Sequence, residues 1–436
     1  MQPLIKLIKK TYKMAGIKER KVVLNNFASL SVLQAITYIL PVVILPYLFQ
    51  VLGPEKFGLV AFAQAFVQYF MILTDYGFGI SATKEISLCQ DQPGKVSRIF
   101  SAVMAVKIGL ASLSMFALCF ILYFIPKFRN DWMVYVLSFG SVIGNSIFPV
   151  WFFQGTEKMK HIADVNIAGG IVLAAFIFFF VKGPQDYLMV PLINSSVFLG
   201  TGIIGQYIVF RKFGISYKFP GYKNLRQQLE AGWNIFISNV AINAYTTSRI
   251  FAVGLLTNNT VTGFYSIAEK IANLFQTFPL ASFTQALFPR LSKIYLRNKV
   301  KAVKLMQRLQ QISTLIAFFG LPIIFIFAHL IVKFVCAGDY PETVLSLRLL
   351  LIGVFFVCSN AFRVQFLLVC GRTHIYSRIH IMMAMVGLPL IFLLIWAFSY
   401  VGAAISTVII EAGIFTLTYF TVRNVVSYCV KPPRKS

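Results

Sequence analysis

The sequence predicts an all-α integral membrane protein with about twelve transmembrane helices in two six-helix halves. Of its 436 residues, 58% are hydrophobic and only 12% are charged, whereas a soluble domain carries about a quarter charged residues. Apolar runs of about 20 residues, the length that crosses a bilayer, recur from one end of the chain to the other. No segment between them is long enough to form a separate soluble domain.

The elements follow one another as apolar runs divided by short polar segments. The weakest division is the last, where only Ser399-Tyr-Val-Gly402 separates two helices. In chain order, the predicted spans are 25–47, 57–80, 99–124, 132–153, 163–181, 188–210, 232–256, 264–288, 312–334, 345–369, 380–398 and 401–422.

The distribution of basic residues orients these spans. Thirty of the 40 Lys and Arg residues fall on one side of the membrane and five on the other, and the basic side of such proteins faces the cytoplasm. Both termini are therefore predicted to be cytoplasmic. The net charge of +26 is then a topology signal with added attraction to anionic membrane lipids, and no nucleic acid partner is needed to explain it.

The same pattern divides the chain into five parts. The first part interleaves cations with apolar residues, which suits an amphipathic helix on an anionic leaflet; a disordered basic tail is the alternative. The predicted parts are a basic cytoplasmic N-terminus (1–23), an N-terminal six-helix half (24–210), a cytoplasmic linker (211–231), a C-terminal six-helix half (232–422) and a basic cytoplasmic tail (423–436).

Two segments form an internal repeat. Residues 51–87 align with residues 256–292 without a gap, and the alignment places Gly58 on Gly263. Each segment is the second helix of a six-helix half, so both halves enter the membrane in the same sense, as in transporters built from parallel repeats. Chance similarity between apolar helices is the alternative.

Four basic residues inside predicted spans are candidates for substrate binding: Arg249, Arg363, Lys107 and Lys270. A charge within a span is costly and normally faces the bundle interior or a water-filled cavity. Arginine binds phosphate oxygens through two parallel hydrogen bonds and lysine acts as a point charge. The alternative is that these long side chains extend to the membrane surface.

Three acidic residues are candidates for coupling to an ion: Asp75, Glu411 and Glu269. Asp75 and Glu411 are too short to reach the membrane surface, so such an acid could take up and release a proton during transport. The alternative is a static ion pair with one of the four cations. Glu269 and Lys270 are adjacent and lie about 100° apart around a helix, so they do not face each other.

Aromatic residues divide into two expected groups. Trp132, Trp151 and Tyr187 lie near span ends, where such residues anchor a protein at the membrane surface. The tyrosines closest to the buried polar residues are modest candidates for sugar contacts: Tyr69, Tyr76 and Tyr245.

Several classes of chemistry are not supported. The sequence has no G-x-x-x-x-G-K-[ST] phosphate loop and no H-E-x-x-H or paired-cysteine metal motif, so we expect no cofactor and no metal. His161, His374 and His380 lie at cytoplasmic loops or span edges, where a solvated role is expected. Cys336 is the one cysteine expected on the external side of the membrane, and it has no second cysteine there with which to form a disulfide.

Two motifs resemble a known family. The segments Leu45-Pro-Tyr-Leu-Phe-Gln-Val-Leu-Gly-Pro-Glu-Lys-Phe-Gly58 and Thr74-Asp-Tyr-Gly-Phe-Gly79 resemble the O-antigen repeat-unit flippases of the Wzx type, in the multidrug/oligosaccharidyl-lipid/polysaccharide exporter superfamily. Val261-Thr-Gly-Phe-Tyr-Ser-Ile-Ala-Glu-Lys270 resembles the later motif of the family. One departure is that many members carry an acid in span 7, where this chain has Ser248-Arg249.

The resemblance implies a V-shaped bundle like that of the MATE transporters, with a central cavity that is often cationic. It also implies transport of undecaprenyl-pyrophosphate-linked oligosaccharide across the bacterial inner membrane by alternating access, coupled to an ion. A polysaccharide polymerase and a chain-length regulator are the protein partners it suggests. A small-molecule antiporter is the alternative with the same fold. A membrane polymerase or ligase is disfavoured because the external loops are about ten residues or shorter.

Overall fold

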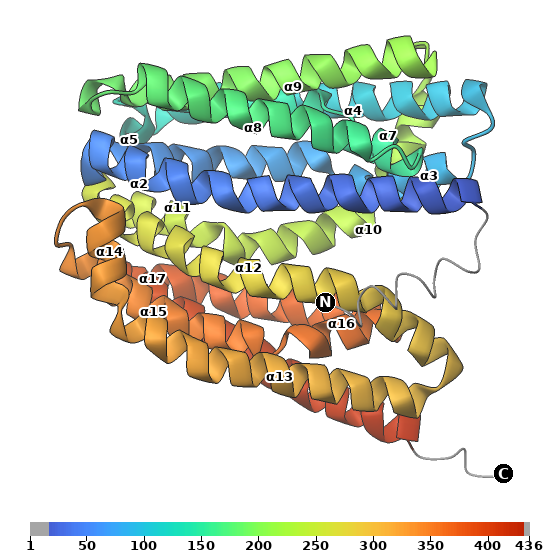
Figure 1. Ribbon diagram of the computed structural model, residues 1–436. Helices are drawn as coiled ribbons and strands as arrows, with labels where there is room; N and C mark the ends of the chain where they lie inside the picture. Colours follow the sequence, from blue (N-terminus) through green and yellow to red (C-terminus); the bar gives the residue numbers. More distant parts are fainter. Residues whose placement is uncertain (1–16, 431–436) are drawn as a thin grey trace. The chain divides into compact units, whose positions relative to one another are not determined.

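The computed structural model describes residues 17–430, with side chains for residues 40–276, 291 and 294–426 (Figure 1). Within this range the secondary structure is helical, as predicted. Most of the predicted N-terminal amphipathic segment, residues 1–16, and the end of the basic tail, residues 431–436, lie outside the described residues. Eight described helical stretches are long and apolar enough to cross a membrane. The protein is therefore a multi-span membrane protein, and the count of twelve spans stays a prediction.

The chain forms two compact units. Unit 1 comprises residues 1–41, 73–180 and 191–236. Its helices are the start and the last three residues of α2 (Ile17–Asp75), α3 (Phe78–Ser87), α4 (Pro93–Phe124), α5 (Pro126–Arg129), α6 (Trp132–Ile147), α7 (Val150–Gly155), α8 (Lys160–Phe180), most of α9 (Met189–Phe213) and the first part of α10 (Tyr222–Thr246).

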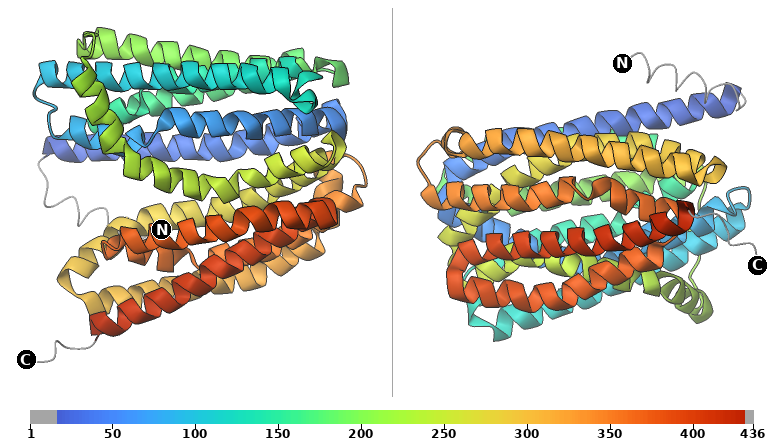
Figure 2. Two further views of the ribbon diagram at one scale, coloured as in Figure 1. Left: turned by 180° about the vertical axis from the view of Figure 1, so that it is seen from behind. Right: turned by 90° about the horizontal axis from the view of Figure 1, so that it is seen from below.

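Unit 2 comprises residues 42–72, 181–190 and 237–436. In both views of Figure 2, its orange and red helices α13, α15 and α17 lie side by side with α12. Its helices are the rest of α2, the short 3-10 helix η1 (Pro184–Leu188), the end of α10, α11 (Ser248–Leu256), α12 (Asn259–Arg297), α13 (Lys299–Ile326), α14 (Ala328–Cys336), α15 (Pro341–Cys358), α16 (Ala361–Val369) and α17 (Thr373–Val430).

Two of the longest helices contain the reversals that the sequence predicts between spans. In α2 the backbone leaves the helical region at Gly53, with φ 70° and ψ 168°, a conformation that glycine adopts readily. In α17 it does so at Ser399, with φ 54° and ψ −136°. The break at Ser399 confirms the predicted division between the last two spans. Gly402 lies so close to the backbone of Leu394 that no Cβ would fit, which explains the glycine after this turn.

The two repeat-related glycines meet in unit 2. A Cβ on Gly58 would lie 1.8 Å from the Asn259 carbonyl oxygen, and a Cβ on Gly263 would lie 2.0 Å from the Pro54 carbonyl oxygen. The contact is reciprocal, because positions 54 and 259 are also equivalent in the repeat. The helices after Gly53 and Asn258 therefore cross through matching glycines, and the repeat 51–87/256–292 describes a real structural equivalence at this crossing.

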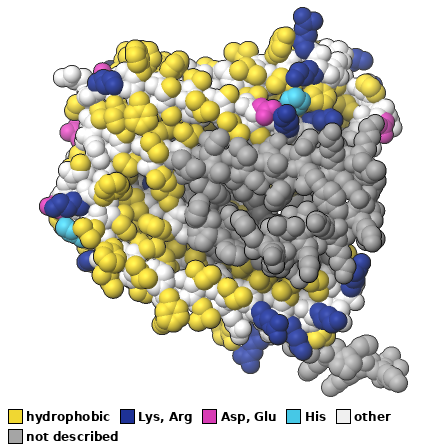
Figure 3. Space-filling model, in the orientation of Figure 1, with side chains coloured by type: hydrophobic (Ala, Val, Ile, Leu, Met, Phe, Trp, Pro, Cys, Tyr) yellow, Lys and Arg dark blue, Asp and Glu magenta, His cyan; other side chains and the backbone are white. Residues whose placement is uncertain are grey.

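The surface supports a lipid environment. Phe179 is 72% exposed in α8 of unit 1, and Phe319 is 66% exposed in α13 of unit 2. In the space-filling view, hydrophobic side chains cover the visible length of these helices, and Lys and Arg side chains gather where α8 and α13 begin (Figure 3). Apolar residues exposed along whole helices indicate contact with acyl chains rather than with water.

One predicted surface anchor is wrong. Trp151 is only 2% exposed and packs against Phe100 in the core of unit 1, whereas Trp132 is 48% exposed. The chain leaves α6 before Pro149 and restarts as α7, a helix of six residues. This restart turns Trp151 inward, which hydropathy alone does not reveal.

Candidate functional site

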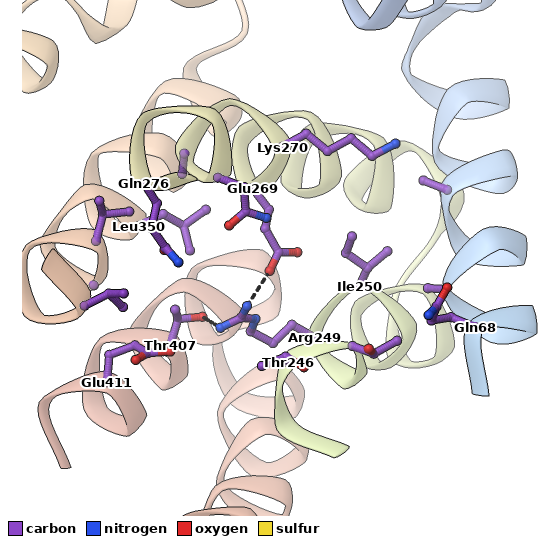
Figure 4. Close-up of a pocket in the computed structure, with 18 of the residues that line it drawn as sticks. Gln68, Thr246, Arg249, Ile250, Glu269, Lys270, Gln276, Leu350, Thr407 and Glu411 are labelled. Atoms are coloured by element: carbon purple, nitrogen blue, oxygen red, sulfur yellow. Dashed lines mark hydrogen bonds and ion pairs between the residues drawn. The ribbon is translucent and has the colours of Figure 1, made fainter. Parts of the chain in front are cut away.

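A polar cavity of about 450 Å³ lies within unit 2 (Figure 4). Six helices contribute to its wall: α2, the end of α10, α11, α12, α15 and α17. The α15 side is apolar and includes Leu350 and Val354. The polar lining residues are Gln64, Gln68, Thr246, Thr247, Arg249, Glu269, Lys270, Asn273, Gln276, Thr407 and Glu411.

The polar lining follows from helical spacing. Gln64 and Gln68 are four residues apart on α2, as are Thr407 and Glu411 on α17, and residues at this spacing share one helix face. On α12, Glu269, Asn273 and Gln276 follow the same rule. Polar residues thus line one face of each of these otherwise apolar helices, and the fold turns those faces toward one another.

Arg249 and Glu269 form a buried ion pair at the centre of the cavity wall. The distance between Arg249 Nη2 and Glu269 Oε1 is 2.8 Å, and their side chains are 9% and 6% exposed. Arg249 Nη1 also donates to Thr407 Oγ1 at 3.3 Å. In the described part of the chain, Arg249 Nε and Glu269 Oε2 have no hydrogen-bond partner. The pair therefore neutralises its charges but leaves a donor and an acceptor unused.

Lys270 and Glu411 complete the charges of the cavity. The Lys270 side chain runs away from the ion pair toward α2 in Figure 4, and its ammonium lies 5.3 Å from the centre of the Phe57 ring. Glu411 lies one turn after Thr407 on α17. Among the described residues, neither charge has an ion-pair partner within 4 Å. Both remain available to a ligand or a proton.

Two of the predicted site residues meet in unit 1. Lys107 Nζ lies 3.1 Å from Asp75 Oδ1, and Asn145 Nδ2 donates to the same oxygen at 3.1 Å. The Lys107 side chain is 3% exposed and that of Asp75 is 54% exposed. The predicted span 57–80 places Asp75 within a membrane helix with a buried side chain, and this is wrong: α2 ends at this residue, the chain turns at Tyr76 and Gly77, and the side chain is exposed.

Arg363 lies outside the cavity lining, at the start of α16 in unit 2. Its guanidinium stacks against two aromatic rings of α17 and donates to the carbonyl of Ser359 at 2.8 Å. The structure thus brings four of the predicted site residues together around the unit 2 cavity: Arg249, Lys270, Glu269 and Glu411. It pairs Lys107 with Asp75 in unit 1. Arg363 lies in unit 2 but does not line the cavity.

Histidine 380 is a polar residue whose position the sequence did not reveal. It is 8% exposed rather than solvated, and its Nδ1 lies 2.7 Å from the Tyr245 hydroxyl. Tyr245 and Tyr76 are themselves buried, at 3% and 7% exposed, so direct contact of these two tyrosines with a sugar is disfavoured. Tyr69 is half-buried beside the cavity and bonds to Ser248.

Other expectations concern metals and cysteines. No cluster of three or more potential metal ligands occurs among the described residues. Cys336, expected on the external side of the membrane, is buried at the end of α14, and burial raises the pKa of its thiol to about 12. A thiol that stays protonated is a poor nucleophile, so Cys336 is inert at neutral pH.

The chemistry of the unit 2 cavity is that of a polar binding site. Amide and hydroxyl side chains can both donate to and accept from the hydroxyl groups of a ligand, while Lys270 and Arg249 can attract an anion. A charged, amide-lined cavity inside a membrane-spanning bundle is a functional-site hypothesis by default.

Comparisons with known proteins agree with this description. The family model described as polysaccharide biosynthesis protein matches residues 23–295. A protein of Escherichia coli (strain K12) is 33% identical over 402 residues, which cover 92% of this chain and 96% of the relative. A protein of Shigella dysenteriae is 26% identical, with 89% and 96% covered. Both carry the name "Putative O-antigen transporter".

Solved structures share the fold. A multidrug resistance MATE family transporter of the MOP superfamily, in an inward-facing conformation, matches with a TM-score of 0.72 and 13% identity, covering 90% of this chain and 96% of that one. The lipid II flippase MurJ, in an inward closed conformation, matches with a TM-score of 0.70 and 14% identity, covering 90% and 87%. The predicted MATE-like fold class is confirmed at this level.

Proposed function

The chain belongs to the polysaccharide biosynthesis protein family, and on this premise we propose that it is a flippase for lipid-linked oligosaccharides. Its substrate would be an undecaprenyl-pyrophosphate-linked repeat unit of O-antigen or a related polysaccharide. The flippase would move this unit from the cytoplasmic to the periplasmic leaflet of the bacterial inner membrane. The observation that carries the proposal is the match to named O-antigen transporters over about nine-tenths of the chain.

The proposed architecture has twelve spans in two halves, 24–210 and 232–422, joined by the linker 211–231. The basic termini, 1–23 and 423–436, would both be cytoplasmic. Alternating access between the halves would carry the substrate, coupled to an ion. A polysaccharide polymerase and a chain-length regulator would act on the substrate once it has crossed.

The site proposal is refined by the ion pairs. Arg249 and Lys107 each have an acidic partner, which offsets their attraction for a phosphate. Lys270 and Arg363 have none among the described residues, so we propose them before the other two as contacts for anionic groups of the substrate. Glu411 is the better coupling candidate of the three acids, because Glu269 and Asp75 are held in ion pairs. An unpaired carboxyl group in a buried site is easily neutralised by a proton.

A small-molecule antiporter remains the second candidate. The two acids in the cavity, Glu269 and Glu411, are the observation that favours it, because carboxylates attract organic cations. Uptake of an organic cation such as ethidium into vesicles that contain the purified protein, driven by a proton gradient, would support this function against the first.

The proposal is tested by deleting the gene in its host and separating the surface lipopolysaccharide on a gel, with a complemented strain as control. We expect all O-polysaccharide to disappear, including core capped with a single unit, while lipid-linked units accumulate inside the cell. If single-unit-capped core persists and only the long ladder is lost, units still cross the membrane. The chain would then act in polymerisation, and the flippase proposal would be wrong.

A further inference from the structure

One face of α17 links the cavity to Arg363. Thr407, Glu411, Phe415 and Tyr419 follow at intervals of four residues, so each lies beside the next on the helix surface, in a stripe that turns by about 40° per step and about 120° in all. The first two line the cavity. The rings of Phe415 and Tyr419 lie nearly parallel, at 14°, with centroids 6.4 Å apart. A polar segment and an aromatic segment are therefore continuous on one helix face.

Arg363 covers the aromatic segment. The centre of its guanidinium lies 4.9 Å from the Phe415 ring centroid and 5.1 Å from that of Tyr419. Of its five N–H donors, one bonds to Ser359, and no carboxylate lies within 4 Å among the residues described. The side chain is half-buried. It is thus a cation held against two rings, with donors left over.

The backbone that carries Arg363 is held from α13. Helix α15 ends at Cys358 and α16 begins at Ala361, and the side-chain oxygen of Gln310 accepts from the backbone N–H of Phe362 and of Arg363, at 3.2 and 3.3 Å. Gln310 is 4% exposed. A buried side chain thus accepts from backbone N–H groups that the helix break leaves unpaired, and this fixes the start of α16 in place. A helix broken inside a membrane is a common feature of transporter binding sites.

The two segments are far enough apart to bind different parts of one molecule. Eight residues separate Glu411 from Tyr419, or about 12 Å at the α-helical rise. At the first, the cavity offers amides, hydroxyls and balanced charges. At the second, Arg363 offers an unpaired planar cation beside aromatic rings. Planar guanidinium groups match phosphate oxygens, and amides match sugar hydroxyls.

We infer that this face of α17 is a two-part ligand track, in which Arg363 binds a phosphate ester and the unit 2 cavity binds the hydroxylated part of the same ligand. The inference rests on the proposed function, and it names the subsites for the diphosphate and the glycan. The rings of Phe415 and Tyr419 hold the guanidinium in place behind its free donors, which reduces the entropy lost when the phosphate binds.

The first test measures binding of inorganic pyrophosphate to the purified full-length chain in phosphatidylcholine nanodiscs by calorimetry. We expect Arg363→Gln to weaken binding at least tenfold, and Arg363→Lys to weaken it several-fold because the planar fork is lost. The matched control is Arg348→Gln. Arg348 also lies over an aromatic ring, that of Phe325 at 5.3 Å, but off the track. Affinity of Arg363→Gln within twofold of the wild type, or an equal loss in Arg348→Gln, would overturn the assignment.

The second test separates the two parts of the track. Native mass spectrometry compares undecaprenyl pyrophosphate with and without one attached hexosamine. The wild-type chain should prefer the glycosylated form, and Gln276→Leu should remove that preference while leaving pyrophosphate affinity unchanged. If Gln276→Leu weakens both lipids equally, or the wild type shows no preference, the division into two subsites is wrong. Thermal unfolding of each variant shows that it is folded.

A membrane phospholipid is the other source of a phosphate ester near Arg363. Repeating the calorimetry in nanodiscs that contain phosphatidylglycerol distinguishes the two sources. Pyrophosphate affinity that is unchanged supports the substrate subsite, and affinity abolished by phosphatidylglycerol would show a lipid headgroup site instead. Either result is independent of the gene deletion: loss of only the long ladder would refute the flippase even if Arg363 binds pyrophosphate.

Discussion

The two ion pairs inside the predicted spans differ in which partner is exposed to solvent. In unit 1, Lys107 is 3% exposed but its partner Asp75 is 54% exposed. In unit 2, both Arg249 and Glu269 are under 10% exposed. The carboxylate of the first pair lies at the accessible surface of the protein and is also bonded to Asn145, whereas each charge of the second depends on the other. The comparison shows two kinds of charge pair within a span. In an open pair, as in unit 1, one partner is exposed; in a closed pair, as in unit 2, both partners are buried and each charge is neutralised by the other.

The hydrogen bonds around each pair sharpen this contrast. In unit 1, the acceptor Asp75 Oδ1 receives two donors, from Lys107 and Asn145. In unit 2, Arg249 Nε and Glu269 Oε2 lack a partner among the described residues. Buried polar atoms that lack a hydrogen-bond partner destabilise a protein unless a water molecule or a ligand bonds to them. The closed pair is therefore the one whose energy a ligand or water in the cavity can change.

The largest effect is expected for Arg249→Ala. It leaves Glu269 buried without its cation, and breaking a buried pair on one side destabilises a protein by about 3–5 kcal/mol. The measurement is thermal or denaturant unfolding of the purified protein in detergent.

The control for Arg249→Ala is the double variant Arg249→Met/Glu269→Leu, which removes both charges and keeps the volume. It should recover most of the lost stability, because apolar pairs of similar size often replace buried ion pairs without loss. A double variant as unstable as Arg249→Ala would show that the stability of this site does not depend on each charge neutralising the other.

The sequence predicted the charges but not their pairing. Static ion pairs were one of the two alternatives for the acids, and Glu269 and Asp75 both realise it. The repeat aligned Gly58 with Gly263, and in the structure the helices that carry these two glycines are in contact at them. The charges and the alignment depend on residue type and spacing along the chain, which a sequence shows directly, whereas the pairs and the contact depend on packing between helices.

What the sequence could not show depends on packing between distant helices. The predicted span 57–80 runs through Tyr76 and Gly77, but the helix breaks there. A Cβ on Gly77 would lie 2.7 Å from Ile235, a contact with a helix about 160 residues later. The burial of His380 follows in the same way from the approach of Tyr245. The hydropathy of the residues around a position does not predict which distant residues will pack against it.

A smaller effect is expected for Asp75→Ala in unit 1. Among the described residues, this change leaves the buried ammonium of Lys107 with the Asn145 carbonyl alone, at 3.4 Å. A buried group left without its partner destabilises by about 1–3 kcal/mol, less than in unit 2 because one acceptor remains. Unfolding measured under the same conditions as for Arg249→Ala gives a direct comparison.

The reverse change, Lys107→Met, is the control within unit 1. It leaves a carboxylate that is 54% exposed and still bonded to Asn145, so we expect a loss of about 1 kcal/mol or less. In unit 1, removing the cation should therefore cost less stability than removing the acid, because only the acid is exposed. No such difference is expected in unit 2, where both partners are buried. If Lys107→Met proved more harmful than Asp75→Ala, the solvent exposure of Asp75 would not be the deciding factor.

The smallest effect is expected for Thr407→Val, which replaces the hydroxyl beside Arg249 with a methyl group. The hydroxyl accepts from Arg249 and donates to the carbonyl of Ala403 at 2.9 Å. The loss should be about 1 kcal/mol, because Arg249 keeps its bond to Glu269 and the carbonyl of Ala403 stays within the helix. Thr416→Val is the matched control: Thr416 makes the same bond to the residue four positions earlier, at 2.8 Å, but is exposed. Equal losses in the two variants would mean that the contact between Thr407 and Arg249 adds nothing, and that the closed pair depends on Glu269 alone.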